Sequence, residues 1–286
     1  MENEAKPDLL RLAENWSIPS FTETIFFPPR KPYFVVIPVI NEGERIQNQL
    51  RKMHNAGVSK LADIILIDGG STDGSLETSF LQKVGVCALL TKTGEGKLSA
   101  QLRCAYAWAL QHQAQGIVTI DGNDKDGVGQ IATFISKLST GSGYLQSSRF
   151  IKGGEAKNTP LLRLLAIRLF HAPLQSLAAW VWLTDTTQGF RGYSSAFLLD
   201  PGTQPFRDIF KKYELLAYLT VRASQLGYQV EEIPTSRIYP KHEKTPTKIT
   251  GIMPLVDLAL IVVKVLFRVY HPKKLPRLQD KTDLKP

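Results

Sequence analysis

Short apolar runs rich in β-branched residues alternate along the chain with longer stretches in which apolar residues recur every three or four positions. The first period is typical of buried strands and the second of amphipathic helices. In the first half of the chain the pattern predicts strands over residues 33–38, 63–67, 85–90 and 116–120. It predicts helices over residues 42–55, 74–84 and 96–113. Each helix is long enough to bring the next strand back parallel, so we expect an α/β sheet with helices on both faces.

The order of elements changes after residue 127. The pattern predicts a helix over 128–138, a strand over 144–150, an apolar stretch over 160–183, a strand over 189–193, a helix over 209–226 and a strand over 229–233. No internal repeat or low-complexity linker divides this region. The simplest division is an N-terminal extension (1–30), one α/β domain (31–250) and a C-terminal appendage (251–286).

Residues 161–183 form one of two long apolar segments. Arg163, Arg168 and His171 interrupt it, so it is unsuited to span a membrane, and Pro173 is expected to break it into two helices. Two amphipathic helices with aromatic and basic residues fit a platform that faces lipid. The alternative is a helical hairpin that covers one face of the sheet.

Residues 252–270 form the second apolar segment, and Asp257, Lys264 and Arg268 make one narrow polar stripe along it if it is helical. From residue 264 onward the chain has seven Lys or Arg against Asp280 and Asp283. An amphipathic helix followed by a basic tail predicts attachment to an anionic membrane surface. The alternative is a helix packed on the core of the domain itself.

The composition narrows the class of protein. With 43% hydrophobic and 21% charged residues, the chain is globular rather than disordered. Its net charge of +9 suits an anionic partner, but the basic tail lacks the interleaved aromatic residues that stack on bases, so we expect no nucleic-acid binding. Two cysteines, Cys87 and Cys104, cannot make a disulfide framework, and the start of the chain has no secretory signal pattern, which together predict a cytoplasmic protein.

Polar clusters follow three of the predicted strands, at residues 38–42, 68–74 and 121–126. In open α/β sheets ligands bind at the carboxyl ends of the strands, so these clusters predict one common site. Glycines beside Asp68 permit close approach of a ligand, and the oxygens of 121–126 are of the type that Mg2+ or Mn2+ prefers. A nucleoside diphosphate with a bound cation suits this set. Lys97, just before a predicted helix, is within reach of a phosphate or is simply solvated.

These segments resemble family 2 inverting glycosyltransferases of the GT-A fold, and are most similar to dolichyl- and polyprenyl-phosphate sugar synthases. The matching motifs are Ile-Pro-Val-Ile-Asn-Glu at 37–42, residues 67–74, the acidic motif at 121, Ser-Ser-Arg-Phe at 147–150, residues 185–192 and Tyr-Glu-Leu-Leu at 213–216. They occur in the family's order, and the resemblance covers residues 33–248. It implies a Rossmann-like GT-A sheet that binds a nucleotide-sugar.

The resemblance also assigns roles to individual residues. The donor would be bound by Pro38, Asn41, Glu42 and Asp68, the metal by Asp121, and the acceptor phosphate by Arg149 and Arg191. The residue types themselves add Gly70 and Lys97 at the donor, Asn123 and Asp124 at the metal, and Lys157 and Arg163 at the acceptor phosphate. Arg149 and Asp185 would be the catalytic pair, with Asp185 either an acid close to the acceptor or a turn cap.

Three positions depart from the family's usual pattern. The family commonly has a second acid where Gly69 stands, an Asp where Asn123 stands, and an aromatic residue where Ile40 stands. Gly69 in place of a second acid leaves open whether the donor is linked to UDP or to GDP. Asn123 in place of an Asp predicts weaker metal binding, because an amide is a neutral oxygen ligand.

These observations lead to one hypothesis and two alternatives. We expect a metal-dependent enzyme, peripheral on the inner face of the membrane, that transfers a sugar from a UDP- or GDP-linked donor to a lipid phosphate with inversion. One alternative is a glycosyltransferase that extends a surface polysaccharide or glycolipid, which needs a general base. The other is a non-catalytic nucleotide-sugar-binding protein. The sequence leaves open whether the protein forms a homo-oligomer.

Overall fold

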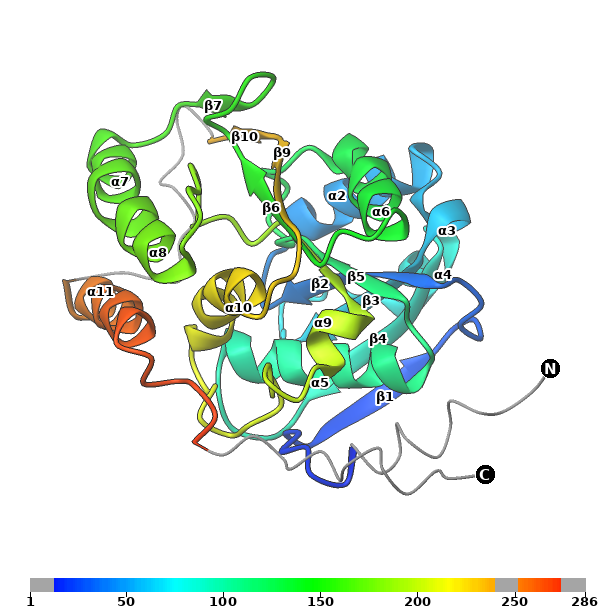
Figure 1. Cartoon of the computed structure of the whole chain (residues 1–286). Coiled ribbons are helices and arrows are strands. Elements are labelled where there is room, and N and C mark those ends of the chain that lie inside the picture. Colours follow the sequence, from blue (N-terminus) through cyan, green and yellow to red (C-terminus); the bar gives the residue numbers. More distant parts are fainter. Residues whose placement is uncertain (1–12, 240–251, 274–286) are drawn as a thin grey trace.

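A single large sheet runs through the centre of the computed structural model, which describes residues 13–239 and 252–273 (Figure 1). Its eight strands are β1 (Phe21–Ile25), β2 (Tyr33–Val39), β3 (Asp63–Asp68), β4 (Val86–Lys92), β5 (Gly116–Thr119), β6 (Tyr144–Ser148), β8 (Arg191–Ser194) and β9 (Val230–Pro234). They lie in the order β1-β4-β3-β2-β5-β8-β6-β9. β1 and β8 run antiparallel to their neighbours, and the other pairs are parallel. All seven strands that the hydrophobic pattern predicts are therefore confirmed, with ends shifted by one or two residues.

Helices cover both faces of the sheet. Strand β2 shows why, since Phe34 and Val36 pack into one apolar cluster and Val35 and Ile37 into the other. The second cluster lies under α2 (Glu44–Asn55), α3 (Val58–Leu61), α4 (Thr78–Lys83), the 3-10 turn η1 (Val128–Gln130) and α6 (Ile131–Ser139). The first lies under α5 (Leu98–Gln111), α9 (Ser195–Leu199) and α10 (Glu214–Gln225). The predicted α/β fold with helices on both faces is confirmed.

Two pairings escaped the hydrophobic pattern. β1 comes from the predicted N-terminal extension and pairs with β4, and its residues are mostly exposed, so no buried period marks it. The short strands β7 (Glu155–Lys157) and β10 (Ser236–Ile238) form a separate parallel pair. β10 thereby brings a segment from late in the chain close to residues 148–157.

The first apolar segment forms α7 (Leu161–Ala166), the π-helical turn η2 (Ile167–His171) and α8 (Ala172–Ala179). Pro173 is the second residue of α8, so the predicted interruption takes the form of a π-turn directly before it. The second apolar segment forms α11 (Ile252–Leu266), which lies against α8 and α10 (Figure 1). None of the helices in the described part of the chain is long and apolar enough to cross a membrane.

Candidate active site

The loops after β2 and β3 are joined by hydrogen bonds, as the clusters at their strand ends predicted. The backbone N–H of Asn41 donates to Ser71 Oγ over 2.9 Å, and the Asn41 side chain accepts from the N–H of Thr72 over 2.8 Å. The N–H of Gly43 donates to a carboxylate oxygen of Asp73 over 2.7 Å. Two of the three predicted clusters thus form one surface at the carboxyl edge of the sheet.

Asp68, the last residue of β3, is almost fully buried beneath this surface. Its carboxylate accepts hydrogen bonds from Ser71, at 2.9 Å from the N–H and 2.6 Å from the hydroxyl. In this structure the carboxylate therefore shapes the loop that contains Gly70, which is exposed and has a φ of 97°. The contact of Asp68 with a nucleoside stays a prediction.

Gly69 stands where the family resemblance led us to expect a second acid, and the structure gives a reason for the glycine. A Cβ atom there would lie 3.0 Å from Gln101 Nε2. That nitrogen donates to the carbonyl oxygens of Val39 and Ile67, each over 3.0 Å, and so ties the ends of β2 and β3 to α5. Gln101 takes up the space that a side chain at position 69 would need.

A polar hollow of about 410 Å³ lies beside these loops. It is lined by Asn41, Glu42, Gly43, Glu44, Arg45 and Asp73. Arg45 forms an ion pair with Glu42 over 3.0 Å and adds a cation that the sequence analysis did not single out. Burial acts to raise the pKa of Asp73, but hydrogen bonds from Ser75 and Gly43 lower it below its ordinary value, so this wall stays anionic.

The other two residues predicted to bind the donor lie at the same edge of the sheet. Pro38 is the half-buried penultimate residue of β2. Lys97 is exposed and directly precedes α5, where its N–H donates to the carbonyl of Lys211 over 2.7 Å. The structure places these residues at the predicted edge, and their contacts with a donor stay predictions.

The predicted metal-binding loop follows β5, and its three members have different surroundings. The carboxylate of Asp121 is 26% exposed and lies 3.3 Å from Arg237 Nη2. Asn123 is half-buried and its side-chain oxygen accepts from the N–H of Lys125. Asp124 pairs both carboxylate oxygens with Lys52 on α2, at 2.8 and 2.7 Å. In this structure Asp124 is therefore paired with α2, and its assignment as a metal ligand stays a prediction.

Asp121 and Asn123 nevertheless fit a divalent cation. The carboxylate of Asp121 is only loosely paired, and Gly189 lies so close to it that a Cβ would be 2.1 Å from Asp121 Oδ1. Gly189, in the motif at residues 185–192, thus leaves room for this carboxylate. Across the residues described, no group of three His, Cys, Asp or Glu side chains is arranged to hold a metal ion, so oxygens of a bound diphosphate would have to complete the coordination.

Arg149 and Asp185 form a buried ion pair with two hydrogen bonds. Arg149 Nε and Nη2 lie 2.7 and 3.1 Å from the two carboxylate oxygens, and both side chains are at most 1% exposed. The third guanidinium nitrogen, Nη1, is buried and has no hydrogen-bond partner among the residues described. A buried N–H of a cation without an acceptor is costly, so this nitrogen marks a position that suits an anionic ligand.

Asp185 is poorly placed to act as a general base. Burial acts to raise its pKa, but the hydrogen bonds and the charge of Arg149 bring the pKa below its ordinary value. Its carboxylate also accepts from Gln188 Nε2 over 2.8 Å and from the hydroxyl of Thr187 over 3.2 Å. With both oxygens occupied and no exposed surface, the carboxylate holds Arg149 in place in this structure, which favours a positioning role over that of a general base.

Arg191 is also fully occupied by the protein. Its Nε donates to the carbonyl of Gln188, its Nη2 to the carbonyl of Thr186 and its Nη1 to Leu216 O and Thr220 Oγ1. Every guanidinium nitrogen thus binds a protein oxygen, and the residue is 2% exposed. In this structure Arg191 joins β8 to α10, and its binding of the acceptor phosphate stays a prediction.

The two remaining residues predicted to bind the acceptor phosphate differ in position. Arg163 on α7 is half-buried and donates to the hydroxyl of Tyr239 over 3.2 Å. Lys157 on β7 is exposed and pairs with Glu155 over 2.8 Å. Arg163 therefore lies in the cationic region around Tyr239, whereas Lys157 lies on the outer surface.

Tyr239 is the centre of a group of cations, of which the sequence analysis named only Arg163 as a site residue. The charged groups of Lys125, Arg163 and Arg237 lie 5.4, 5.7 and 5.8 Å from the centre of its ring. Burial acts to raise the pKa of Tyr239, but Arg237, Arg163 and Arg149 lower it below its ordinary value. Arg237 lies on β10, whose three residues are too few to show a period, so only the basic character of the segment signalled it. The basic residues and prolines of 239–248 also predict a mobile loop that closes over the phosphates, with a solvated connection as the alternative, and this segment lies outside the described residues except for Tyr239.

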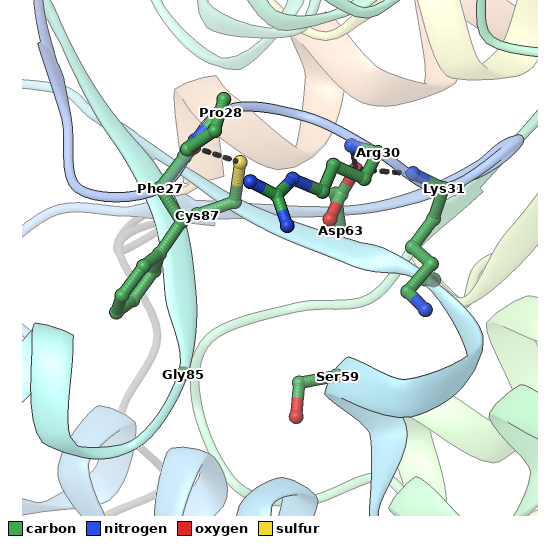
Figure 2. A pocket seen from close by; sticks show the side chains of 9 residues that line it. Phe27, Pro28, Arg30, Lys31, Ser59, Asp63, Gly85 and Cys87 are labelled. Atoms are coloured by element: carbon green, nitrogen blue, oxygen red, sulfur yellow. Dashed lines mark hydrogen bonds between the residues drawn. The ribbon is translucent and has the colours of Figure 1, made fainter.

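A second hollow, of about 300 Å³, lies at the opposite edge of the sheet, where β3 and β4 begin (Figure 2). The carboxylate of Asp63 accepts from the backbone N–H groups of Arg30 and Lys31, at 2.7 and 2.8 Å. The thiol of Cys87 donates to the carbonyl of Phe27, and burial raises its pKa to about 12. None of the residues predicted for the site lines this hollow.

The chain is similar to known glycosyltransferases over most of its length. No family model matches the chain. The polyprenol monophosphomannose synthase of Mycolicibacterium smegmatis is 23% identical over 236 residues, which are 78% of this chain and 83% of that protein. A crystal structure of glucosyl-3-phosphoglycerate synthase from Mycobacterium tuberculosis, bound to Mn2+, UDP and phosphoglyceric acid, has a TM-score of 0.56 at 13% identity. The similar region spans 94% of this chain and 83% of the chain of that synthase. The same synthase with UDP alone has a TM-score of 0.53 at 15% identity, over 96% of this chain and 87% of its own.

The fold and the enzyme class are those of a glycosyltransferase. The predicted GT-A architecture is confirmed, because the chain is similar in fold to a solved glycosyltransferase structure over 94% of its length. The crystal structures with Mn2+ also show that divalent cations bind to proteins of this fold.

Proposed function

We propose that this glycosyltransferase moves a sugar from a UDP- or GDP-linked donor to a polyprenyl phosphate, with inversion at the anomeric carbon. The similarity to a polyprenol monophosphomannose synthase over 83% of that protein's length supports this acceptor. The family resemblance in the motifs supports inversion and a requirement for Mg2+ or Mn2+. The acceptor class is a polyprenyl phosphate, and the identity of the sugar is a question for experiment.

The buried Nη1 of Arg149 is the observation that carries the acceptor assignment. Asp185 fixes the other two nitrogens, so the guanidinium is held rigidly with one donor group unused among the described residues. A phosphate needs such a cation for positioning, and it arrives already ionised, so it needs no base. Arg163 is a second cation in this region, since it donates a hydrogen bond to the hydroxyl of Tyr239. The charges of Arg149 and Arg163 both lower the pKa of Tyr239, so both cations lie close to this side chain. A sugar hydroxyl would need the proton acceptor that Asp185 does not provide.

At the donor, Asp121 and Asn123 would hold the divalent cation, which would neutralise the charge that develops on the departing diphosphate. Gly189 leaves the carboxylate of Asp121 its space. The loops after β2 and β3 would bind the nucleoside in and beside the hollow at Asn41 and Asp73. The acceptor phosphate oxygen would attack the anomeric carbon on the side opposite the diphosphate, which gives inversion.

A lipid acceptor requires access to a membrane, and a group of exposed apolar side chains offers a surface for it. We call this group the apolar platform. It consists of Leu161, Leu162, Leu165, Leu169, Phe170, Leu177, Trp180, Trp182, Val256, Leu260, Phe267 and Val269. Leu162 on α7 is 82% exposed, and Leu169 on the following turn η2 is 74% exposed. α7 also carries Arg163, whose side chain lies in the cationic region around Tyr239. Large exposed apolar side chains on neighbouring helices are typical of membrane or protein contacts.

Two observations favour a membrane as the occupant of the platform. α11 lies against α8, and Arg268 stacks on Trp180 at 5.2 Å, so both predicted amphipathic segments contribute to one region of the molecule. Arg168, Lys264 and Arg268 add positive charge among the apolar residues, as an anionic lipid surface would attract. The inner face of the membrane is the side that we propose, since both Cys87 and Cys104 are free thiols.

Transfer by the Arg149→Ala variant tests the proposed acceptor. Wild-type protein with Mn2+, a UDP- or GDP-sugar and a short polyprenyl phosphate should release nucleoside diphosphate and form a glycolipid. The Arg149→Ala variant should lose about 100-fold or more of this transfer while the donor dissociation constant is unchanged. Arg51→Ala, which removes an exposed arginine from α2, is the control and should transfer normally.

Three results would contradict the proposal. Loss of donor binding in the Arg149→Ala variant would place this arginine in the donor site. Transfer to a glycolipid or oligosaccharide hydroxyl, with none to the lipid phosphate, would establish the polysaccharide alternative. Donor binding by the wild type without turnover on any acceptor, 3-phosphoglycerate included, would favour the non-catalytic alternative.

Liposome binding tests the apolar platform. The double variant Leu162→Glu and Leu169→Glu should lose at least about tenfold in partitioning to anionic vesicles, because two charges would enter the lipid interface. Both side chains are exposed, so the melting temperature should not change. Undiminished sedimentation with vesicles would exclude this surface as the membrane contact.

A further inference from the structure

Arg237 lies beside the predicted metal-binding loop although more than 100 positions separate them in the sequence. Strand β10 runs along residues 125–127, where the N–H of Gly127 donates to Ser236 O over 3.3 Å and the N–H of Ile238 donates to Lys125 O over 3.0 Å. The two segments form an antiparallel bridge at Arg237 itself. These backbone hydrogen bonds therefore fix the position of the Arg237 main chain beside the loop that follows β5.

The guanidinium makes two unequal ion pairs. Its Nη1 lies 2.5 Å from Asp126 Oδ2, and the side chain of Asp126 has no exposed surface. Its Nη2 lies 3.3 Å from Asp121 Oδ2, on a carboxylate that is 26% exposed. The contact with Asp126 is short and buried, whereas the contact with Asp121 is longer and partly exposed to solvent. One end of the guanidinium is thus anchored and the other is only loosely held.

Asp126 has little else to bind. Its second oxygen, Oδ1, is buried without a hydrogen-bond partner in the part of the chain described here. Leaving a buried carboxylate without its cation is strongly unfavourable, so Asp126 keeps Arg237 in place. Asp121, in contrast, is the carboxylate that fits the divalent cation at the donor site.

We propose that Arg237 is a positioning and counter-charge residue of the donor site, anchored by Asp126, which neutralises Asp121 until the cation and the donor diphosphate bind. This rests on the proposed function and goes beyond it by assigning a role to a residue pair that the motifs do not include. Arg237 competes for Asp121 in the protein without donor. When a diphosphate is present, its Nη2 leaves Asp121 for a phosphate oxygen while Nη1 stays on Asp126.

Two substitutions should change the affinity for Mn2+ in opposite directions. Arg237→Gln frees Asp121 from its competing cation, so Mn2+ should bind about tenfold more tightly in the absence of nucleotide. Asp126→Asn removes the anchor, so Arg237 can pair fully with Asp121 and Mn2+ should bind more weakly. The loss of the free Mn2+ signal in electron paramagnetic resonance measures both affinities without any turnover. Arg51→Gln is the control and should bind Mn2+ like the wild type.

Nucleotide binding provides the second measurement. At saturating Mn2+, titration calorimetry with UDP, and with GDP in parallel, should show about tenfold weaker binding to Arg237→Gln, because one charged contact to the diphosphate is lost. A residue that served only to hold the fold would weaken both ligands together. Opposite shifts for Mn2+ and nucleotide are therefore the result that supports the proposal.

Folding must be checked, because Asp126 loses its cation in the Arg237→Gln variant. Thermal melts of each variant serve this purpose, and Arg237→Lys replaces the glutamine variant if that one does not fold. A lysine at position 237 still pairs its positive charge with Asp126, but it has no second nitrogen to reach Asp121. The shifts in Mn2+ and nucleotide affinity should therefore have the same signs and be smaller. Unchanged Mn2+ affinity in folded variants, or shifts of the same sign in Arg237→Gln and Asp126→Asn, would overturn the proposal. If the wild type binds neither Mn2+ nor nucleotide, the proposed function itself fails.

Discussion

Replacing Asp185 with Asn tests the conclusion that this residue orients Arg149. The carboxylate accepts from Arg149 Nε at 2.7 Å, Arg149 Nη2 at 3.1 Å and Gln188 Nε2 at 2.8 Å. Asparagine has one oxygen, so its amide nitrogen would face at least one of these donors. The substitution leaves Arg149 as a buried cation without an anion.

The structure sets the size of this effect. Both partners are at most 1% exposed, and removing one member of a buried ion pair costs about 3–5 kcal/mol. For a chain of this length each kcal/mol corresponds to about 2–4 °C, so the melting temperature should fall by about 10 °C. Glu155→Gln is the matched control, because it breaks an exposed pair with Lys157 and should cost about 1 kcal/mol or less.

The dependence on pH identifies the cause. The folded pKa of Asp185 lies below its unfolded value of about 3.9, so the stabilisation by its charge is fully present above that pH and is lost as the pH falls through the folded pKa. Urea unfolding followed by circular dichroism should show a constant difference between wild type and Asp185→Asn from pH 5 to 8, and a smaller one below pH 4. A difference of less than 1 kcal/mol at pH 7 would refute the reasoning.

Three further substitutions test other parts of the site. Gly189→Ala places a Cβ 2.1 Å from Asp121 Oδ1, so Mn2+ affinity should fall by at least about tenfold in calorimetry, with Gly129→Ala, which meets nothing within 4 Å, as the control. Gly69→Ala displaces Gln101 from two carbonyls and should cost about 1–2 kcal/mol in urea unfolding; an unchanged midpoint would show that Gln101 has room to move. His171 has its pKa lowered to about 4 by burial and by Arg191, below an unfolded value of about 6.5, so wild-type stability should decline as the pH falls from 6.5 to 4. His171→Gln should remove that part of the decline, and equal slopes for both proteins would contradict this assignment.

The hydrophobic pattern was sufficient for seven of the eight strands of the sheet, because buried strands and amphipathic helices must each carry their own period. Elements without a buried face escaped it, as β1 shows, whose residues are mostly exposed on the edge of the sheet. The strand ends also gave the location of the candidate site, since parallel strands place their carboxyl ends at one edge. The partners of Asp124 and Arg191 could not be predicted, because the type of residue does not reveal which partner a charged side chain finds.

The sequence by itself determined the α/β architecture, the edge proposed for the site and the class of enzyme, because these depend on local periods and on motifs in a fixed order. Only the tertiary structure decided how the charges are paired. It joined Arg149 to Asp185 across 36 positions, turned Asp124 to Lys52 and set Arg237 between Asp121 and Asp126. The physical reason is that the energy of a charged group depends on its burial and its nearest counter-ion, which are properties of long-range packing and not of neighbours in the chain.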